Sequence, residues 1–182
     1  PKLAPLMQAS PELEIHLHAA PEATVLTGVL DGQFDLGLLS HDPDHPRLSA
    51  NLIGREELCL ILPAADMPQA VTFADLEARG FIAHPDGFAY ANDLFSLNFP
   101  DEFQGADRLR LRGYLNQMSQ IPAPVADGAG YTLLPRSGVD AFRQPERLAV
   151  ASLPRQIHHE LWLVQRRGRP LSARLQALAA VM

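Results

Sequence analysis

Short, almost continuously apolar runs surrounded by amphipathic segments constrain the fold of this chain most strongly. The runs Phe34–Leu39 and Leu58–Leu62 are too short for helices and are typical of strands covered on both faces. The segment Pro21–Leu30 carries its apolar residues at helical spacing, and Gly32 follows it at the position of a helix C-cap. This alternation of strands and helices predicts an α/β fold with mostly parallel sheets.

The same patterns predict the remaining elements. Glu14–Ala19 alternates polar and apolar residues, as a strand near a sheet edge does, with His16 and His18 on its outer face. Any helix within Asn116–Ala126 must be kinked or begin late, because it contains two prolines. Further strands are expected at 81–83, 109–114, 131–134, 148–153 and 161–164, and further helices at 1–7, between 72 and 80, at 89–99 and after 172.

Polar residues mark where several of these helices begin. Thr72 and Asp75 are spaced as a capping box, and Ser137 and Asp140 are interpreted as a second capping pair. Ser172 is expected to cap the final helix. The apolar residues expected on the buried side of that helix are Leu175, Leu178 and Met182.

Composition excludes several classes of function. The net charge of −6 argues against a nucleic-acid surface, and the one dense basic run, Arg166–Arg169, is interpreted as a solvated turn. Cys59 is the only cysteine, so a disulfide framework or cysteine-ligated metal site cannot form within one chain, and it is expected in the core. We find no membrane-span-length apolar run and no signal peptide, and therefore expect a cytoplasmic protein.

The turn Ser40–His45 is the first candidate site. It follows a predicted buried strand, and ligands of open α/β sheets bind beyond the carboxyl ends of strands, so Ser40 and His41 are candidate ligand-binding residues. The alternatives are a metal site built from the two histidines and two aspartates of the turn, and a plain solvated turn. No known metal-ligand spacing is matched, so no metal is predicted.

A second group of candidates follows the later strands. His84 comes after the strand 81–83 and either accepts a ligand group or caps the next helix. Asn116 and Gln117 can both donate and accept hydrogen bonds, which suits a polar ligand, although Asn116 is equally suited to capping a helix.

No catalytic motif is found. The sequence lacks G-x-S-x-G, H-E-x-x-H and the P-loop, and the adjacent His158 and His159 would point to opposite faces of a strand. We therefore predict neither an enzyme nor a cofactor.

The chain resembles the effector domains of LysR-type transcription regulators. The resemblance rests on the order and spacing of four segments, which are Leu30–Gly37, Leu52–Pro63, Val125–Pro135 and Glu160–Arg174. It implies a type 2 periplasmic-binding-protein fold, in which two Rossmann-like α/β subdomains are joined by two crossover segments. Subdomain I would comprise residues 1–62 plus 163–182, and subdomain II residues 63–162.

The resemblance also implies a function. A small-molecule effector would bind between the subdomains and alter the oligomer geometry, with Gly130, Tyr131 and Thr132 lining the site. The family's first strand and its DNA-binding domain would precede Pro1, so DNA would be contacted only through that domain. We expect a homodimer of this domain, using the opening helix and Glu14–Ala19 against subdomain II of the partner, and a tetramer of the intact regulator. A solute-binding protein of a transporter, which shares the fold, is the alternative.

Overall fold

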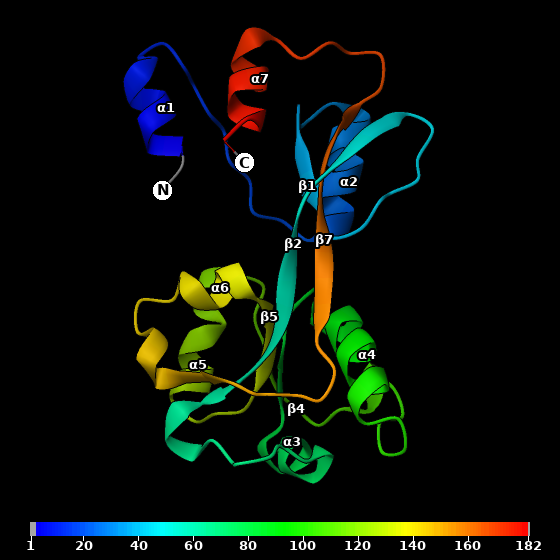
Figure 1. The fold of residues 1–182 in the computed structure, drawn as a ribbon, viewed down its shortest axis with the longest axis vertical. Coiled ribbons are helices and arrows are strands. Elements are labelled where there is room, and N and C mark those ends of the chain that lie inside the picture. Colours follow the sequence, from blue (N-terminus) through cyan, green and yellow to red (C-terminus); the bar gives the residue numbers. More distant parts are fainter. Residues whose placement is uncertain (1–2, 182) are drawn as a thin grey trace. The chain divides into compact units, whose positions relative to one another are not determined.

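The computed structural model describes residues 3–181 (Figure 1). Contacts divide the chain into two compact units: unit 1 is Pro1–Arg55 with Glu160–Met182, and unit 2 is Glu56–His159. Strands β2 (Leu48–Pro63) and β7 (Ile157–Arg166) each have residues in both units. The α/β architecture predicted from the sequence is confirmed.

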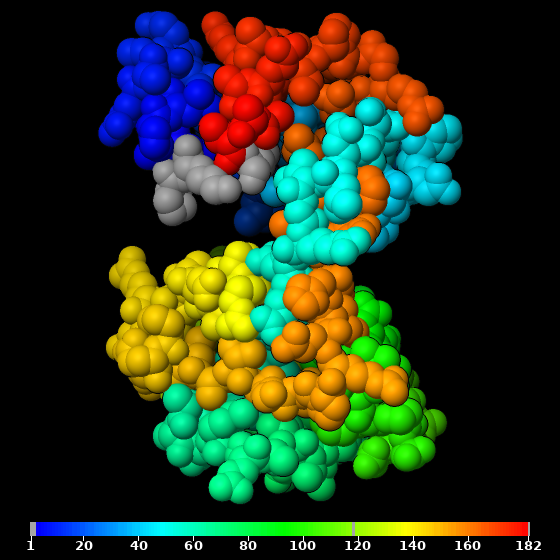
Figure 2. Space-filling model, viewed as in Figure 1, coloured from blue at the N-terminus to red at the C-terminus, as the bar shows by residue number. Residues whose placement is uncertain are grey.

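Unit 1 is a small α/β layer. Strand β1 (Gly37–Leu39) pairs antiparallel with β7, with Leu38 opposite Leu163. Helix α2 packs beside β1, and α1 lies beside α7 on the surface (Figure 2). The helices of this unit are α1 (Leu3–Ala9), α2 (Glu22–Asp31) and α7 (Ala173–Ala179). Its buried core consists of Val29, Leu39, Leu48 and Val164.

Unit 2 contains a two-stranded sheet and part of a five-stranded sheet. The end of β2 pairs antiparallel with both β5 and β6, while β3 and β4 pair in parallel. The strands that lie wholly in this unit are β3 (Phe81–Ala83), β4 (Leu111–Tyr114), β5 (Thr132–Pro135) and β6 (Leu148–Val150). The α-helices are α3 (Phe73–Arg79), α4 (Gly87–Asn98), α5 (Pro122–Ala126) and α6 (Arg136–Asp140).

An aromatic cluster forms the centre of unit 2. The Phe95 ring, which is fully buried, contacts the rings of Phe73, Phe99, Phe103 and Tyr131 at centroid distances of 5.6–6.3 Å. Such edge-to-face and tilted arrangements are the favoured geometries of aromatic pairs. This cluster joins α3 and α4 to Tyr131, the residue before β5, and gives unit 2 its own core.

Four of the predicted signals at helix ends are confirmed. The hydroxyl of Thr72 accepts from the Asp75 N–H while the Asp75 carboxylate accepts from the Thr72 N–H, which is a complete capping box. Gly32 ends α2 in the left-handed conformation at φ +79°, and Ser172 caps α7. Helix α5 begins late, at Pro122.

Three predictions about the sheets are wrong. Most described strand pairings are antiparallel, not parallel. Strand β1 pairs with β7 in this way, and β5 and β6 both pair with β2. Glu14–Ala19 is not a strand, since among residues 3–181 no strand pairs with it. Leu38 is 41% exposed, so β1 is not covered on both faces.

The second capping pair is also wrong. Helix α6 begins two residues earlier than expected, with Pro135 at its N-cap and no side-chain cap. The Ser137 N–H instead donates to the carboxylate of Glu56 on β2 (2.6 Å). Pro1 and Met182, which the sequence places in the opening and final helices, lie outside the described residues. Within that described part, no helix is both long and apolar enough to cross a membrane.

Candidate functional site

A carboxylate organises the polar end of β1 in unit 1. Glu22, in the first turn of α2, accepts hydrogen bonds from the Ser40 N–H (2.5 Å) and the Ser40 hydroxyl (2.8 Å). The Nδ1 atom of His41 lies 3.1 Å from the same carboxylate. The predicted residues Ser40 and His41 therefore lie close together. Glu22, which contacts both of them, was not predicted from the sequence.

The remainder of this turn is held by its own polar groups. The Asp42 carboxylate accepts from the Asp44 N–H (2.9 Å), and Nδ1 of His45 accepts from the Arg47 N–H (3.2 Å). Across the described part of the chain, no three His, Cys, Asp or Glu side chains are grouped as metal ligands would be. The side chains of Asp42 and His45 thus stabilise the conformation of the turn.

His84 lies in the core of unit 2. Its side chain is 1% exposed, and Nε2 lies 2.8 Å from the carbonyl oxygen of Leu133 on β5. It does not cap α4, because Asp86 occupies the N-cap position. Burial lowers the pKa of His84 below its usual value, so the neutral imidazole is favoured and Nε2 donates to the carbonyl.

Gly130, at the end of the glycine turn, and most of the strand after it are buried as well. A Cβ atom at Gly130 would lie 2.5 Å from the Gly80 carbonyl oxygen, which explains why glycine is needed there. Thr132 is fully buried and its hydroxyl donates to the Ile82 carbonyl (2.8 Å). Tyr131 stacks on the ring of Phe81, and within the described residues its hydroxyl has no hydrogen-bond partner.

Asn116 and Gln117 are the exposed candidates of unit 2. Both residues lie just after the end of β4. The residue before them, Leu115, donates its N–H to the carbonyl of Ala83 and so extends the β3–β4 pairing by one residue. Exposed amides at a strand end can contact a ligand without rearrangement of the core. Of the eight predicted residues, Ser40, His41, Asn116 and Gln117 are therefore at least partly exposed, and His84, Gly130, Tyr131 and Thr132 are buried.

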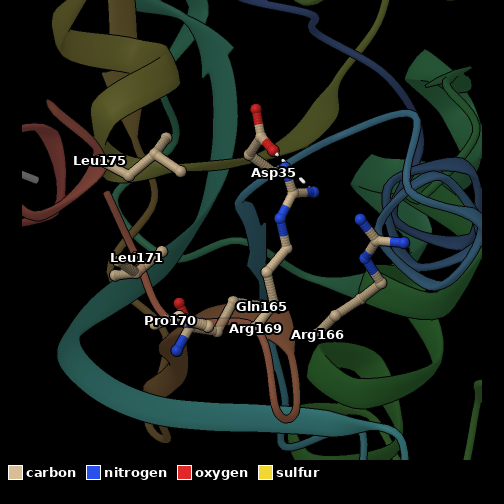
Figure 3. A pocket seen from close by; sticks show the side chains of 7 residues that line it. All are labelled: Asp35, Gln165, Arg166, Arg169, Pro170, Leu171 and Leu175. Atoms are coloured by element: carbon tan, nitrogen blue, oxygen red, sulfur yellow. Dashed lines mark ion pairs between the residues drawn. The ribbon is translucent and has the colours of Figure 1, made fainter. Parts of the chain in front are cut away.

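The basic run Arg166–Arg169 borders a separate hollow in unit 1 (Figure 3). The Arg169 guanidinium is paired with Asp35 (3.1 Å), so its charge is already balanced within the chain. The hollow is lined by Asp35, Gln165, Arg166, Arg169, Pro170, Leu171 and Leu175.

Protonation of His84 should destabilise unit 2. Because its folded-state pKa is lowered, the unfolded chain binds the proton more readily, so the contribution of His84 is complete above about pH 6.5 and is lost as pH falls below that value. We expect the free energy of unfolding of the native chain to decrease between pH 7 and pH 5. Urea titrations at several pH values give this free energy for the native chain and for His84→Gln. The free energy of the native chain should fall more steeply with decreasing pH than that of the variant, and an equal dependence on pH would contradict the assignment.

Comparison with known proteins gives one family match. The sequence model that matches is described as the LysR substrate binding domain, and the match covers residues 1–182. No curated protein matches the sequence.

Solved structures with a similar fold share little sequence with the chain. The regulatory domain of CcmR from Synechocystis PCC6803, in complex with 2-PG, has a TM-score of 0.75 at 18% identity, covering 100% of this chain and 88% of that one. The effector binding domain of QuiR in complex with shikimate has a TM-score of 0.70 at 13% identity, covering 99% and 86%. Full-length CbnR complexed with its target DNA has a TM-score of 0.68 at 19% identity, and the chain, 99% of which is covered, spans 63% of its length.

Proposed function

The chain belongs to the LysR substrate-binding-domain family, and we propose that it senses a small polar metabolite for a LysR-type transcription regulator. The type 2 periplasmic-binding-protein fold expected from the sequence is confirmed. The family match favours this role over that of a transporter's solute-binding protein. Because the chain spans only 63% of CbnR and carries a net charge of −6, we assign DNA contact to another part of a longer protein. We place this regulator in the cytoplasm.

The observation that carries the proposal is a set of accessible hydrogen-bonding groups where strands end. Ser40 and His41 follow β1 in unit 1, and Asn116 and Gln117 follow β4 in unit 2. In α/β folds, ligands are bound beyond the carboxyl ends of strands. Hydroxyl, imidazole and amide groups match a polar ligand of small size.

A role without catalysis is part of the proposal. Burial raises the pKa of the Cys59 thiol to about 12, so the thiolate that a cysteine nucleophile needs is not formed near neutral pH. Within residues 3–181, no His, Cys, Asp and Glu side chains are grouped to hold a catalytic metal. We therefore expect any bound metabolite to be recovered chemically unchanged.

Thermal unfolding across a panel of common metabolites tests the sensing function. One compound class should raise the melting temperature saturably, because a ligand that binds only the folded state stabilises it by mass action. Ser40→Ala and Gln117→Ala should each weaken binding about 5- to 10-fold, the effect of one lost hydrogen bond. Ser152→Ala, which removes an exposed hydroxyl elsewhere, is the matched control. Unchanged affinity in both site variants would refute the assigned residues.

We also propose that the chain forms a homodimer, and a tetramer in the intact regulator. Apolar side chains exposed in each unit support this proposal: Leu17 is 74% exposed in unit 1, whereas Leu111 and Tyr114 are 53% and 58% exposed on β4 of unit 2. Apolar residues on the segment 14–19 and on β4 are suited to contact between two copies. Helix α1, whose Met7 is 46% exposed, extends the surface of unit 1.

A further inference from the structure

The groups at the end of β1 form a site for one negative charge. A backbone N–H and a hydroxyl from Ser40 both donate to a single carboxylate, and the imidazole of His41 lies 3.1 Å from it. The carboxylate lies in the first turn of α2, a helix of 10 residues, where the helix dipole favours negative charge. Backbone N–H and hydroxyl groups are donors that proteins use to bind carboxylate and phosphate ligands.

The chain supplies the negative charge itself. The Glu22 carboxylate, only 24% of whose side chain is exposed, already accepts the hydrogen bonds of the Ser40 N–H and hydroxyl. A carboxylate of a ligand would therefore find these donors occupied and would be repelled by a like charge. From this we infer that Glu22 is a specificity-determining residue, an internal carboxylate that excludes anionic ligand groups from the Ser40–His41 contact. The inference rests on the proposed sensing function and names the ligand class at that site.

The surrounding charges support the same selection. The turn that follows His41 carries Asp42 and Asp44, both exposed, and no lysine or arginine. The nearest cation along the chain, Arg47, donates to the carbonyl of Leu30 near the other end of α2. Leu30 lies eight positions after Glu22 on the helix, a distance of roughly 12 Å.

The effector group that meets this contact is therefore a neutral or cationic hydrogen-bond donor. A carboxylate can accept about four hydrogen bonds, and the Glu22 Oε2 atom accepts one from the Ser40 hydroxyl, which leaves it acceptor capacity. A hydroxyl or ammonium group can donate to that oxygen. A phosphate or carboxylate group can reach the same donors only by displacing Glu22.

Formate, the smallest carboxylate, tests the inference without knowledge of the effector. In Glu22→Ala the three groups lose their carboxylate, and we expect sodium formate to raise the melting temperature saturably by about 2–4 °C relative to sodium chloride at equal ionic strength. The native chain should show no such difference. Glu12→Ala, which removes an exposed carboxylate of unit 1, is the control for the change in net charge and should also show none.

Two results would overturn the inference. One is that formate does not raise the melting temperature of Glu22→Ala, or raises that of the native chain equally. Circular dichroism shows whether Glu22→Ala is folded, and Glu22→Gln serves as a second variant. The other is a carboxylate effector that binds the native chain and loses affinity in Ser40→Ala. If no metabolite of any class binds, the sensing function fails, whereas the formate result is unaffected because it needs no effector.

Discussion

Phe95→Ala should lower the free energy of unfolding of unit 2 by about 4 kcal/mol, the range observed for removal of a buried phenylalanine ring. The ring is fully buried and contacts four other aromatic rings, so its loss leaves a cavity that these side chains cannot fill by small movements. For a chain of this length the corresponding fall in melting temperature is roughly 8–16 °C. Urea denaturation followed by circular dichroism measures the change.

Two matched variants separate ring loss from general damage. Phe95→Leu keeps most of the apolar volume and should cost about 1–2 kcal/mol. Leu52→Ala removes a side chain that is 47% exposed and should cost less than about 1 kcal/mol. If Phe95→Ala were no more destabilising than Leu52→Ala, the aromatic cluster would not be the stabilising core of unit 2.

Features that depend on neighbouring residues could be predicted from the sequence. The capping box of Thr72 and Asp75 spans three residues, and the Gly32 C-cap needs only a backbone conformation that glycine adopts readily. Both are determined by the local chain. The helix with apolar residues at helical spacing, α2, was predicted to within one residue at its C-terminal end.

Sheet membership could not be predicted because it depends on partners far along the chain. Glu14–Ala19 has the alternation of a strand, but in the described structure no strand lies against it. Strand β2 extends ten residues before Leu58, through a stretch that is mostly partly or fully exposed and therefore lacks an apolar pattern. Pairing direction was likewise hidden, since Cys59 lies opposite Leu134 only after the fold has formed.

The candidate site was predicted in part for the same reason. Placing Ser40 and His41 at a strand end needed only the apolar run before them. The burial of His84 was not visible, because its partner Leu133 is 49 residues away. The contact of Glu22 with Ser40 was not visible either, because the two residues are 18 positions apart. The one local indication was that Glu22 is an acidic residue in a first helical turn, where negative charge is favoured.

Leu111→Asp should weaken self-association about 30-fold or more, equivalent to roughly 2 kcal/mol, as expected for an apolar contact at the centre of an interface. The side chain is 53% exposed, so the substitution should leave folding intact while it places a charge in the proposed dimer surface. Sedimentation velocity over a concentration series gives the dimer dissociation constant of the native chain and of the variant. Leu17→Asp, on the opposing surface of the proposed dimer, should have an effect of the same size.

Leu52→Asp is the matched control for both substitutions, because it introduces the same charge at an apolar side chain of similar exposure outside the proposed surface. If all three variants associate equally, the exposed residues of 14–19 and β4 do not form the interface. A native chain that remains monomeric at about 100 μM would exclude a stable homodimer of this domain altogether. Loss of association in the two surface variants alone would instead place both residues 14–19 and β4 in the interface, since introduction of a charge elsewhere does not produce that pattern.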